Sequence, residues 1–551
     1  MMKSSLAVKI TFVLLVLLAG CVDSQNIQPT ATETDVAVVA TASSMVATIP
    51  AVMPTPQPRR APIDYGPEAE DFPAGVNPLT GRAVSDASLL DLPAMLVSIS
   101  NMPVTARPQA GPGFASWVFE LFIGEGATRF MNVFYGEYPR AVPNVVGGCK
   151  VREEIIHPSA HWIGNRVWLD ENENGQQDAW EFGVGGVCVN LYDDIGQLVK
   201  TISTDSNGYY SFDVESERQY SLEFVLPDRY RFTTPNIGDE DNDSDADPAN
   251  GRVAVDSFAS FFDAGLILFE QPDPTPRVIV TGTPPDWFIP DEPYVGPIRS
   301  GRLTYNQIGG LFPNGCLVYA SAAWDIGERL DACEIVYGVD KFTPNSALLT
   351  VARMRELAEE NLNPKQPVNY SGNLFSETPP PNGQIANSIH IHYHSYTQSG
   401  WEYDPVSQMY LRFADQADGK GSLSPATDRL TGRQMSFENV VVLFAEHERF
   451  RHNQLEIDLS LGQKGWAYLF RDGQAFKVQW STLSREWEKT TGLTRPIHFM
   501  DAQNNLIPLH PGRTWIHLVT PYSSVINQGN DGTWLMQFVQ PDDPLDTPEP
   551  E

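Results

Sequence analysis

Residues 170–181 carry oxygen-bearing side chains at the spacing of a calcium-binding loop. Their sequence, Asp-Glu-Asn-Glu-Asn-Gly-Gln-Gln-Asp-Ala-Trp-Glu, fits the pattern D-x-[DN]-x-[DN]-G-x5-E at every specified position. Calcium takes about six to eight hard oxygen ligands in a flexible cage, and a glycine at this point permits the sharp turn. We therefore expect a calcium site; the alternative is a solvated acidic loop. The expected ligands are Asp170, Asn172, Asn174, Gln176 through its backbone carbonyl, Asp178 and Glu181.

A second run of acidic residues follows at 239–245. Asp241, Asp243 and Asp245 occupy alternate positions in it, so their carboxylates could surround a second cation. The competing interpretation is a solvated run of charges, because acidic side chains usually stay on the surface. Both acidic segments fall within 161–265, where 21 Asp and Glu stand against six Lys and Arg.

The stretch that contains both acidic segments has the pattern of a small β-sandwich. Strand-like segments at 187–191, 198–202 and 209–212 are separated by the turn-forming sequences Asp-Asp-Ile-Gly and Ser-Asn-Gly. Short strands at this spacing predict two packed sheets. Amphipathic helices do not flank the calcium loop, which argues against an EF-hand helix pair.

This stretch resembles the B-type repeats of SdrD-like bacterial surface proteins. The segments that carry the likeness are 164–170, 185–189, 204–212 and 239–245. The resemblance implies an Ig-like sandwich that calcium makes rigid and that serves as a spacer or an adhesive element. A structural adhesin is the less favoured alternative, because adhesive stalks usually repeat their modules and this chain has one.

The N-terminal end has the features of an export signal. Lys3 and Lys9 precede an apolar run at 10–18 that is too short to span a membrane, and Leu-Ala-Gly-Cys follows at 18–21. This tetrapeptide resembles a bacterial lipobox, which implies cleavage before Cys21 and lipidation of that residue. We therefore expect an extracytoplasmic lipoprotein anchored to the cell membrane. An ordinary signal peptide with a chance Cys is the alternative.

Length and charge limit the classes of function. The 551 residues carry 37 Lys and Arg against 69 Asp and Glu, a formal net charge of −32. So acidic a surface repels phosphate backbones, and we expect no nucleic-acid partner. With about 100–200 residues per domain, the length predicts roughly three folded units and tails.

The segments on either side of the acidic module together resemble the YerB-like family of bacterial lipoproteins, a family of unknown function. The likeness lies before the module at 77–81, 106–111 and 127–130, and after it at 295–302, 438–442, 465–468 and 511–516. The resemblance implies a mixed α/β N-terminal domain and a β-rich C-terminal domain. Because about 150 residues separate two segments that lie close together in the family, we infer that the module is inserted into a loop of the host.

The predicted fold is therefore multidomain: a mixed α/β host domain, an inserted Ig-like β-sandwich and a β-rich C-terminal domain. The expected boundaries are 1–21 for the signal peptide, 22–70 for a flexible linker and 160–266 for the insert. The N-terminal host domain comprises 71–144 and 290–365, and the C-terminal domain comprises 380–540.

Four arginines occupy family-like positions of the N-terminal host domain in an otherwise acidic protein. Guanidinium groups suit carboxylates and phosphates, so these arginines suggest a site for an anionic ligand such as an envelope polymer. The alternative is that they pair with host carboxylates such as Glu120 and Glu125. The four residues are Arg107, Arg129, Arg299 and Arg302.

Other residues with reactive side chains form less specific patterns. Three histidines at 390, 392 and 394 alternate along an expected strand and therefore share one face; they could bind a metal, but a polar strand face explains them as well. Four aspartates could act as acid/base pairs, although turn and capping roles are commoner. They are Asp404, Asp415, Asp418 and Asp428.

The remaining cysteines form an even set once Cys21 is set aside. Outside the cell, Cys316 could pair with Cys333 and Cys149 with Cys188. Free buried thiols are the alternative.

These features predict a membrane-anchored extracytoplasmic lipoprotein that binds an anionic envelope polymer or an envelope protein and carries a calcium-stabilised insert. The alternative is an envelope hydrolase or transferase that acts on an anionic glycan or a phosphodiester polymer. We assign no catalytic residue, because no nucleophile–base motif such as G-x-S-x-G favours an enzyme.

Overall fold

The computed structural model describes residues 64–140, 147–151, 161–215, 218–239, 241–255, 261–269, 292–338, 345–366, 368–451, 454–529 and 531–541. The predicted signal peptide, Cys21 and most of the predicted linker lie outside these ranges. The protein is mostly β, with 39% strand and 10% helix. The α-helices of the described residues are short: α1 Thr304–Gly310, α2 Trp324–Gly327, α3 Val351–Glu360 and α4 Glu486–Thr491.

The host segments before and after the insert share one sheet of 11 strands, the main sheet. Its order is β16-β15-β3-β5-β4-β30-β24-β27-β28-β18, and β29 pairs with β28. At its centre β4 runs parallel to β30, with Trp117 opposite Thr514. The bounds are β3 Met95–Ser100, β4 Trp117–Phe122, β5 Thr128–Phe134, β15 Cys316–Tyr319, β16 Glu334–Ile335, β18 Gln384–Ile385, β24 Asn439–Phe444, β27 Lys464–Arg471, β28 Gln474–Ser481, β29 His498–Met500 and β30 Thr514–Val519.

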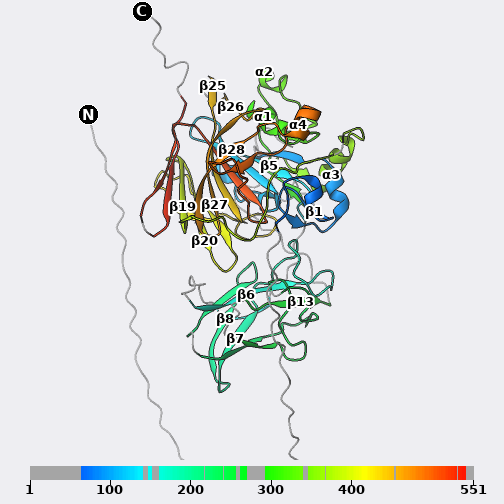
Figure 1. Ribbon diagram of the computed structural model, residues 1–551, viewed down its shortest axis with the longest axis vertical. Helices are drawn as coiled ribbons and strands as arrows, with labels where there is room; N and C mark the ends of the chain where they lie inside the picture. Colours follow the sequence, from blue (N-terminus) through cyan, green and yellow to red (C-terminus); the bar gives the residue numbers. More distant parts are fainter. Residues whose placement is uncertain are drawn as a thin grey trace, which may run out of the picture. The chain divides into compact units, whose positions relative to one another are not determined.

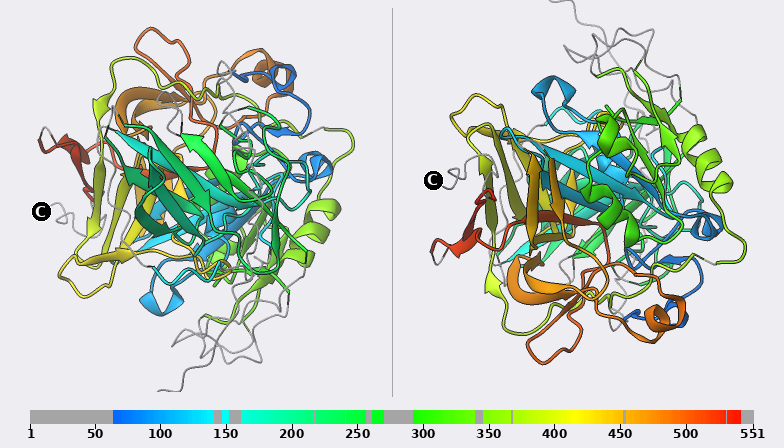
Figure 2. Two further views of the ribbon diagram at one scale, coloured as in Figure 1. Left: turned by 90° about the horizontal axis from the view of Figure 1, so that it is seen from below. Right: turned by 90° about the horizontal axis from the view of Figure 1, so that it is seen from above.

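Strands from opposite ends of the chain therefore lie side by side, and the blue and orange ribbons mix in both sets of views (Figures 1 and 2). The expected mixed α/β N-terminal host domain is not confirmed. Its strands β3, β4 and β5 continue into a sheet with the C-terminal strands, and its helices are few and short.

Both faces of the main sheet are buried, so its strands read as nearly continuous apolar runs. In β4, Phe119 and Leu121 belong to the core that includes α1, whereas Val118 and Phe122 belong to the opposite core. This alternation follows from the two-residue period of a strand. A charged residue in such a strand must therefore find a partner inside the protein.

A second host sheet of seven strands packs on the core that contains Val118 and Phe122. Its order is β22-β21-β20-β19-β32-β31, and β23 pairs with β21. The bounds are β19 Ser388–His394, β20 Thr397–Asp404, β21 Met409–Asp415, β22 Leu423–Pro425, β23 Ser436–Phe437, β31 Ser524–Asn527 and β32 Thr533–Gln537.

The insert forms the predicted β-sandwich from two four-stranded sheets (Figure 1). One sheet has the order β12-β10-β7-β8 and the other β11-β13-β6-β9. Alternate residues of β7 and β10 are buried in a core of their own. The bounds are β6 Trp162–Leu169, β7 Cys188–Asp193, β8 Leu198–Ser203, β9 Tyr209–Asp213, β10 Tyr220–Phe224, β11 Tyr230–Phe232, β12 Arg252–Val255 and β13 Ala264–Leu268.

Smaller elements complete the described chain. Asp472 and Gly473, with φ angles of 52° and 65°, form the hairpin turn between β27 and β28. The longest described helix, α3, has ten residues, and no helix of the described ranges has the length and apolar character of a membrane span. The remaining strand pairs are β1 Val76–Asn77 with β2 Arg82–Ala83, β14 Tyr294–Val295 with β17 Leu349–Thr350, and β25 His447–Arg451 with β26 Gln454–Ile457.

Both suggested disulfides are formed. Cys149 is bonded to Cys188 of β7, and Cys316 of β15 is bonded to Cys333. The first bond ties the segment that enters the insert to one of its sheets, and the second closes a loop at the edge of the main sheet.

Candidate functional site

Arg107 lies apart from the other three arginines that the sequence singles out. Its Nη1 atom donates to the backbone oxygen of Asp415 at 2.5 Å and to the carboxylate of the same residue at 3.5 Å. Its Nε atom donates to the backbone oxygen of Asn101 at 3.1 Å. Arg107 therefore follows the alternative interpretation, in which the guanidinium pairs with a host carboxylate.

Arg129 and Arg299 converge on the hydroxyl of Ser100, and Arg302 lies close to them. Arg129 lies on β5, opposite Ser100 of β3, and its Nη1 atom donates to Ser100 Oγ at 3.3 Å. The Nε atom of Arg299 donates to the same oxygen at 3.0 Å. Arg302 donates to Ser300 Oγ at 2.8 Å. We call Arg129, Arg299 and Arg302 the arginine cluster.

The three charges of the arginine cluster repel one another. Burial lowers the pKa of Arg129 to about 9; Tyr305 opposes this change, whereas the charges of Arg302 and Arg299 add to it. Burial lowers the pKa of Arg299 as well. Within the described ranges, the cluster donates to hydroxyl, amide and backbone oxygens and forms no ion pair with Asp or Glu.

This cluster has the chemistry of an oxyanion site. The Nε atoms of Arg129 and Arg302 are buried and lack a hydrogen-bond partner among the described residues. Arg299 and Arg302 are only partly buried, so solvent and a ligand can reach them. An anion held there would offset the mutual repulsion and accept charge-assisted hydrogen bonds.

The buried host carboxylate Glu120 pairs with a residue that the sequence analysis did not single out. On β4, its Oε1 accepts a hydrogen bond from Thr128 at 2.8 Å and its Oε2 accepts one from Trp515 at 3.2 Å. Arg412 Nη2, from β21, lies 3.6 Å from the same Oε2. Glu120 and Arg412 are each 1% exposed, so this charge pair lies in the core between the two host sheets. It leaves the arginine cluster without Glu120 as a partner.

In the insert, the predicted calcium loop closes on itself through its own side-chain oxygens. Asp170 accepts hydrogen bonds from the backbone N–H groups of Asn174, at 3.1 Å, and Gly175, at 2.9 Å. Glu181 accepts one from the backbone N–H of Asp178 at 3.0 Å. Asp170 and Glu181 are each 2% exposed, so the first and last carboxylates of the loop are turned inward.

The middle positions of the loop add further oxygens. Asn172 and Asn174 donate through their amides to Oδ2 of Asp178, at 2.8 and 3.1 Å, while Asn174 Oδ1 accepts from the N–H of Gln176 at 2.7 Å. The pKa of Glu181 is raised to about 7; burial is the main cause, and the nearby charges of Asp170 and Asp178 contribute to the increase. A bound cation would relieve both effects.

The second acidic run packs against this loop. The backbone N–H of Gln177 donates to the backbone oxygen of Asn242 at 2.6 Å. Asp243 is fully buried, and neither of its carboxylate oxygens has a hydrogen-bond partner among the described residues. Burial raises the pKa of Asp243 to about 6, and the charges of Asp239 and Asp241 add to the increase.

Asp245 is turned toward β13, where its carboxylate accepts a hydrogen bond from the N–H of Asp263 at 2.6 Å. Asp263 is fully buried and bonds Asn165 and the N–H of Arg166, at 2.9 Å each. The charge of Asp243 contributes to a pKa of Asp263 well above its usual range, for which burial is the main cause. The sequence analysis missed Asp263, because a single Asp before a strand carries no local signal.

Across the described part of the chain, no group of three or more His, Cys, Asp or Glu side chains is arranged as a metal site. A group of this kind contains only His, Cys, Asp and Glu side chains. The expected calcium ligands also include the side-chain amides of Asn172 and Asn174 and the backbone carbonyl of Gln176. The calcium site therefore stays a prediction.

The histidine stripe lies on one face of β19, as its alternation predicts, but each histidine has a polar neighbour. A ring nitrogen of His390 lies 2.9 Å from Gln398 Oε1, and one of His392 lies 2.9 Å from Gln537 Nε2. His394 accepts from the N–H of Tyr396 at 3.3 Å. These contacts are those of a polar strand face.

Two of the candidate acid/base aspartates hold turns. Asp428 Oδ2 accepts hydrogen bonds from the N–H groups of Gly111, at 3.0 Å, and Gly113, at 2.9 Å. The carboxylate of Asp404 accepts from the N–H of Ser407 at 3.1 Å. These are the structural roles that the sequence analysis gives as the commoner alternative.

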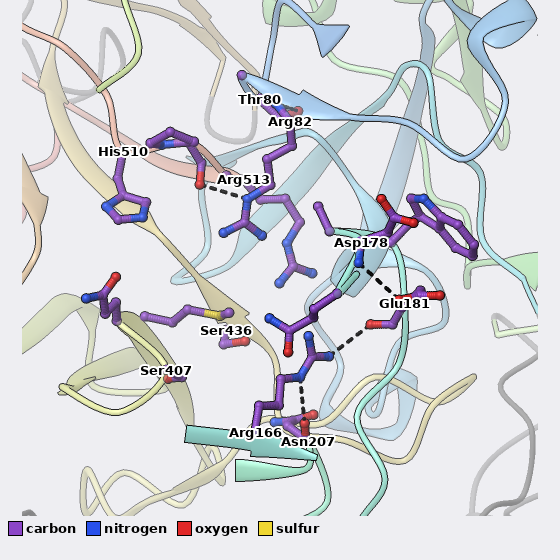
Figure 3. A pocket seen from close by; sticks show the side chains of 18 of the residues that line it. Thr80, Arg82, Arg166, Asp178, Glu181, Asn207, Ser407, Ser436, His510 and Arg513 are labelled. Carbon is purple, nitrogen blue, oxygen red and sulfur yellow. Dashed lines mark hydrogen bonds between the residues drawn. The ribbon is translucent and has the colours of Figure 1, made fainter. Parts of the chain in front are cut away.

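A cleft of about 1060 Å³ lies next to the calcium loop. Host residues of the cleft include Arg82 and Arg513, and insert residues include Arg166, Asp178 and Glu181 (Figure 3). Sequence reasoning missed this cleft, because its lining comes from many short segments that only the fold brings together.

Comparisons with protein families agree with this division of the chain. Residues 79–158 match the N-terminal domain, and 389–516 the C-terminal domain, of a protein family of unknown function, DUF3048. Residues 161–264 match the SdrD B-like domain. The chain thus carries both DUF3048 domains with an SdrD B-like domain between them, as the two resemblances predicted. This combination is consistent with a cell-surface protein.

Similar individual proteins cover different parts of the chain. Serine-aspartate repeat-containing protein F of Staphylococcus epidermidis and protein D of Staphylococcus aureus (strain Newman) are each 38% identical over 99 residues, or 18% of this chain. The match spans only 6% and 8% of those proteins. The crystal structure of YerB protein from Bacillus subtilis covers 80% of this chain and 96% of its own, with 15% identity and a TM-score of 0.42.

Proposed function

We propose that this protein is an extracytoplasmic lipoprotein, anchored through Cys21, whose host body binds an anionic polymer of the cell envelope. The observation that carries the proposal is the arginine cluster: three guanidinium groups lie together at one end of the main sheet without a carboxylate partner in the described residues. The anchor and the location rest on the lipobox resemblance.

A structural role explains the arginine cluster less well than ligand binding does. Arginines that stabilise a fold normally pair with carboxylates or form bidentate hydrogen bonds. Here Arg129 and Arg299 both donate to the single hydroxyl of Ser100, and Arg129 is 7% exposed. Burying positive charges together without an anion costs stability, and a ligand anion would recover that cost.

The proposal includes a calcium ion in the loop of the insert. The residues present fit such an ion, because the loop turns hard oxygens inward and the buried Glu181 has a pKa raised to about 7. Asp170, Asn172, Asn174, Asp178 and Glu181 would hold it with side-chain oxygens, and Gln176 with its carbonyl. The ion would neutralise the loop and make the sandwich rigid. Asp243, whose two carboxylate oxygens have no hydrogen-bond partner among the described residues, supports a second cation.

The arginine cluster is tested by titration calorimetry with inorganic pyrophosphate on the calcium-free chain from Ala61 onward. We expect Arg299→Gln to weaken pyrophosphate binding about tenfold or more, because a charge-assisted hydrogen bond contributes about 1.5–3 kcal/mol. Arg302→Gln is expected to act in the same direction, and the affinity of the wild type is expected to fall as salt rises.

Arg353→Gln is the matched control. This residue also carries one positive charge, but it pairs with Glu334, Glu356 and Glu360 on the surface. We expect it to leave pyrophosphate affinity unchanged. Equal affinity in the wild type, Arg299→Gln and Arg302→Gln would overturn the proposed site.

Sedimentation with purified envelope polymer separates binding from catalysis. We expect the wild type to pellet with the polymer. We also expect mass spectrometry to detect no released fragments. Release of fragments that grows with time would instead favour the hydrolase or transferase alternative.

A further inference from the structure

Three parallel strands of the main sheet end at the edge where the arginine cluster lies. β15 runs parallel to β3 and to β16, so the carboxyl ends of these strands meet at one edge of the sheet. β3 ends at Ser100, the residue whose hydroxyl accepts hydrogen bonds from Arg129 and Arg299. The carboxyl edge of parallel strands is a frequent position of ligand sites, because the loops that follow the strands converge there.

Backbone hydrogen bonds hold the segment that follows β15 against the segment of Arg299. The N–H of Ala320 donates to the backbone oxygen of Arg299 at 2.8 Å, and the N–H of Gly301 donates to that of Ser321 at 2.9 Å. Trp324 comes three residues after Ser321, a span of at most about 11 Å in an extended chain. A ligand that is a few sugar units long could therefore touch both Trp324 and the arginine cluster.

Two aromatic side chains at this edge are turned to solvent. Trp324, the first residue of α2, is 78% exposed, and Tyr337, which follows β16, is 77% exposed. The N–H of Val336 donates to the backbone oxygen of Tyr319, the last residue of β15, at 2.9 Å, so Tyr337 also starts from this edge. Tryptophan and tyrosine are enriched where proteins bind their partners, so their exposure beside an anion site favours a ligand with an apolar face.

The loop that carries Trp324 is anchored at its ends and in its interior. Cys316, at the start of β15, is bonded to Cys333, just before β16, which closes the loop between them. Ile326 and Leu330 of this loop are buried in the core that includes α1. The exposed indole therefore stands on an ordered support, and a ligand that binds it has little conformational entropy to offset.

The charges of this loop indicate what can lie on the indole. Asp325, Glu328 and Asp331 stand against Arg329 in the same loop as Trp324, so an anionic group is disfavoured there. Hydroxyl groups, in contrast, donate to carboxylates, and the negative face of an indole attracts C–H groups. An uncharged sugar ring supplies both hydroxyls and C–H groups, whereas an acidic group belongs at the arginine cluster.

We propose that the arginine cluster binds a glycan that combines charged and uncharged sugar units, with an acidic group at Arg299 and Arg302 and an uncharged ring stacked on Trp324. The inference rests on the proposed function and names the class of polymer that the host body binds. A linear polyphosphate would satisfy the arginines but offers no C–H face to the indole. An anionic membrane surface would be repelled by the carboxylates of the loop.

The test is titration calorimetry, on the same calcium-free chain from Ala61 onward, with a hexasaccharide of alternating glucuronic acid and N-acetylglucosamine. We expect Trp324→Ala to weaken hexasaccharide binding about tenfold, since an aromatic anchor is lost, and to leave pyrophosphate binding unchanged. Trp324→Phe, which keeps an aromatic face, is expected to keep most of the affinity. Tyr337→Ala is expected to weaken hexasaccharide binding by a smaller factor.

Trp466→Ala is the matched control. Trp466 is 49% exposed on β27, and β27 lies five strands from β3 in the order of the main sheet. Five strands correspond to about 24 Å at about 4.8 Å per strand. We expect this variant to change the affinity for neither the hexasaccharide nor pyrophosphate.

Two results would overturn the inference: equal hexasaccharide affinity in the wild type and Trp324→Ala, or no hexasaccharide binding by the wild type. If Arg299→Gln still weakens pyrophosphate binding, only the glycan is rejected and the proposed function stands. Equal affinities of the wild type and Arg299→Gln for both probes would reject the proposed function itself. Binding to phosphatidylglycerol vesicles that depends on Trp324, without hexasaccharide binding, would replace the glycan by a membrane contact.

Discussion

The insert and the host place their charges in opposite ways. In the insert, one face of strands β7 and β10 is only partly buried, and surface pairs such as Arg252 with Glu223, at 3.3 Å, lie at the edge of a sheet. In the host, the main sheet is covered on both faces. Its residues Glu120 and Arg129 are buried, as is Arg412 on β21 of the second host sheet.

This contrast indicates which kind of binding site each region can form. The charges of the insert concentrate in two acidic segments that carry excess negative charge, which suits cations. A buried charge of the host must find its partner inside the protein, and such a charge either has an ion-pair partner or has none among the described residues. The Glu120–Arg412 pair is the first case, and the arginine cluster is the second.

Breaking the buried pair of Glu120 and Arg412 is expected to lower the stability of the protein most. Glu120→Gln leaves Arg412 buried without a counter-charge, so we expect the free energy of unfolding to fall by about 3–5 kcal/mol. The double variant Glu120→Gln with Arg412→Met is expected to lose less than Glu120→Gln alone. Urea denaturation of all four proteins measures both values, and strict additivity of the two single effects would contradict a coupled pair.

The next effect concerns calcium in the insert. A ligand that binds only the folded state stabilises it by about 2.7 kcal/mol when its free concentration is about 100 times Kd. We therefore expect calcium to raise the unfolding temperature of the wild type and to have little effect on Glu181→Gln. Scanning calorimetry with calcium and with magnesium measures this, and an equal shift in both proteins would argue against the loop as the site.

The pH dependence of the calcium-free protein tests the same loop through its electrostatics. Glu181, with a pKa raised to about 7, holds a proton that the unfolded chain, with a pKa near 4.3, has released. Stability is therefore highest below pH ~4.3 and is lost as the pH rises through about 7. Asp243, with a pKa of about 6, acts in the same direction.

Calcium is expected to reverse this dependence, because the ion binds the carboxylate form and competes with protons. Unfolding free energies at pH 5 and pH 7, with and without calcium, test the sign. A calcium-free protein that gains stability between pH 5 and pH 7 would contradict the buried, protonated state of these acids.

Removing a charge at the surface of the insert is expected to change the stability of the protein least. Glu223 accepts a hydrogen bond from Arg252 at 3.3 Å in a partly exposed position. We expect Glu223→Gln to change the free energy of unfolding by less than about 1 kcal/mol. A loss comparable with that of Glu120→Gln would remove the contrast between the two regions.

How much the sequence could predict depends on how local each feature is. The calcium loop and the turn at Asp472 and Gly473 are visible because their residues are consecutive. The pairing of Arg107 with Asp415 joins residues 308 positions apart and leaves no local trace. The arginine cluster is intermediate: family-like segments picked out its members, but only the pairing of β3 with β5 places Arg129 beside Ser100.

The cleft could not be predicted, because its arginines at 82, 166, 433 and 513 come from four separate segments. A similar cause explains why the mixed α/β character expected for the N-terminal host domain is not confirmed. The pairing of β4 with β30, which merges segments from the two ends of the chain into one sheet, leaves no pattern in either strand.

A crystal structure of the protein soaked with tungstate shows whether the arginine cluster binds an oxyanion. We expect a tungstate ion within hydrogen-bonding distance of Arg299 and Arg302, and loss of that ion in Arg299→Gln crystals. Tungstate bound at other sites while these two guanidiniums pair with a carboxylate of the chain would contradict this expectation.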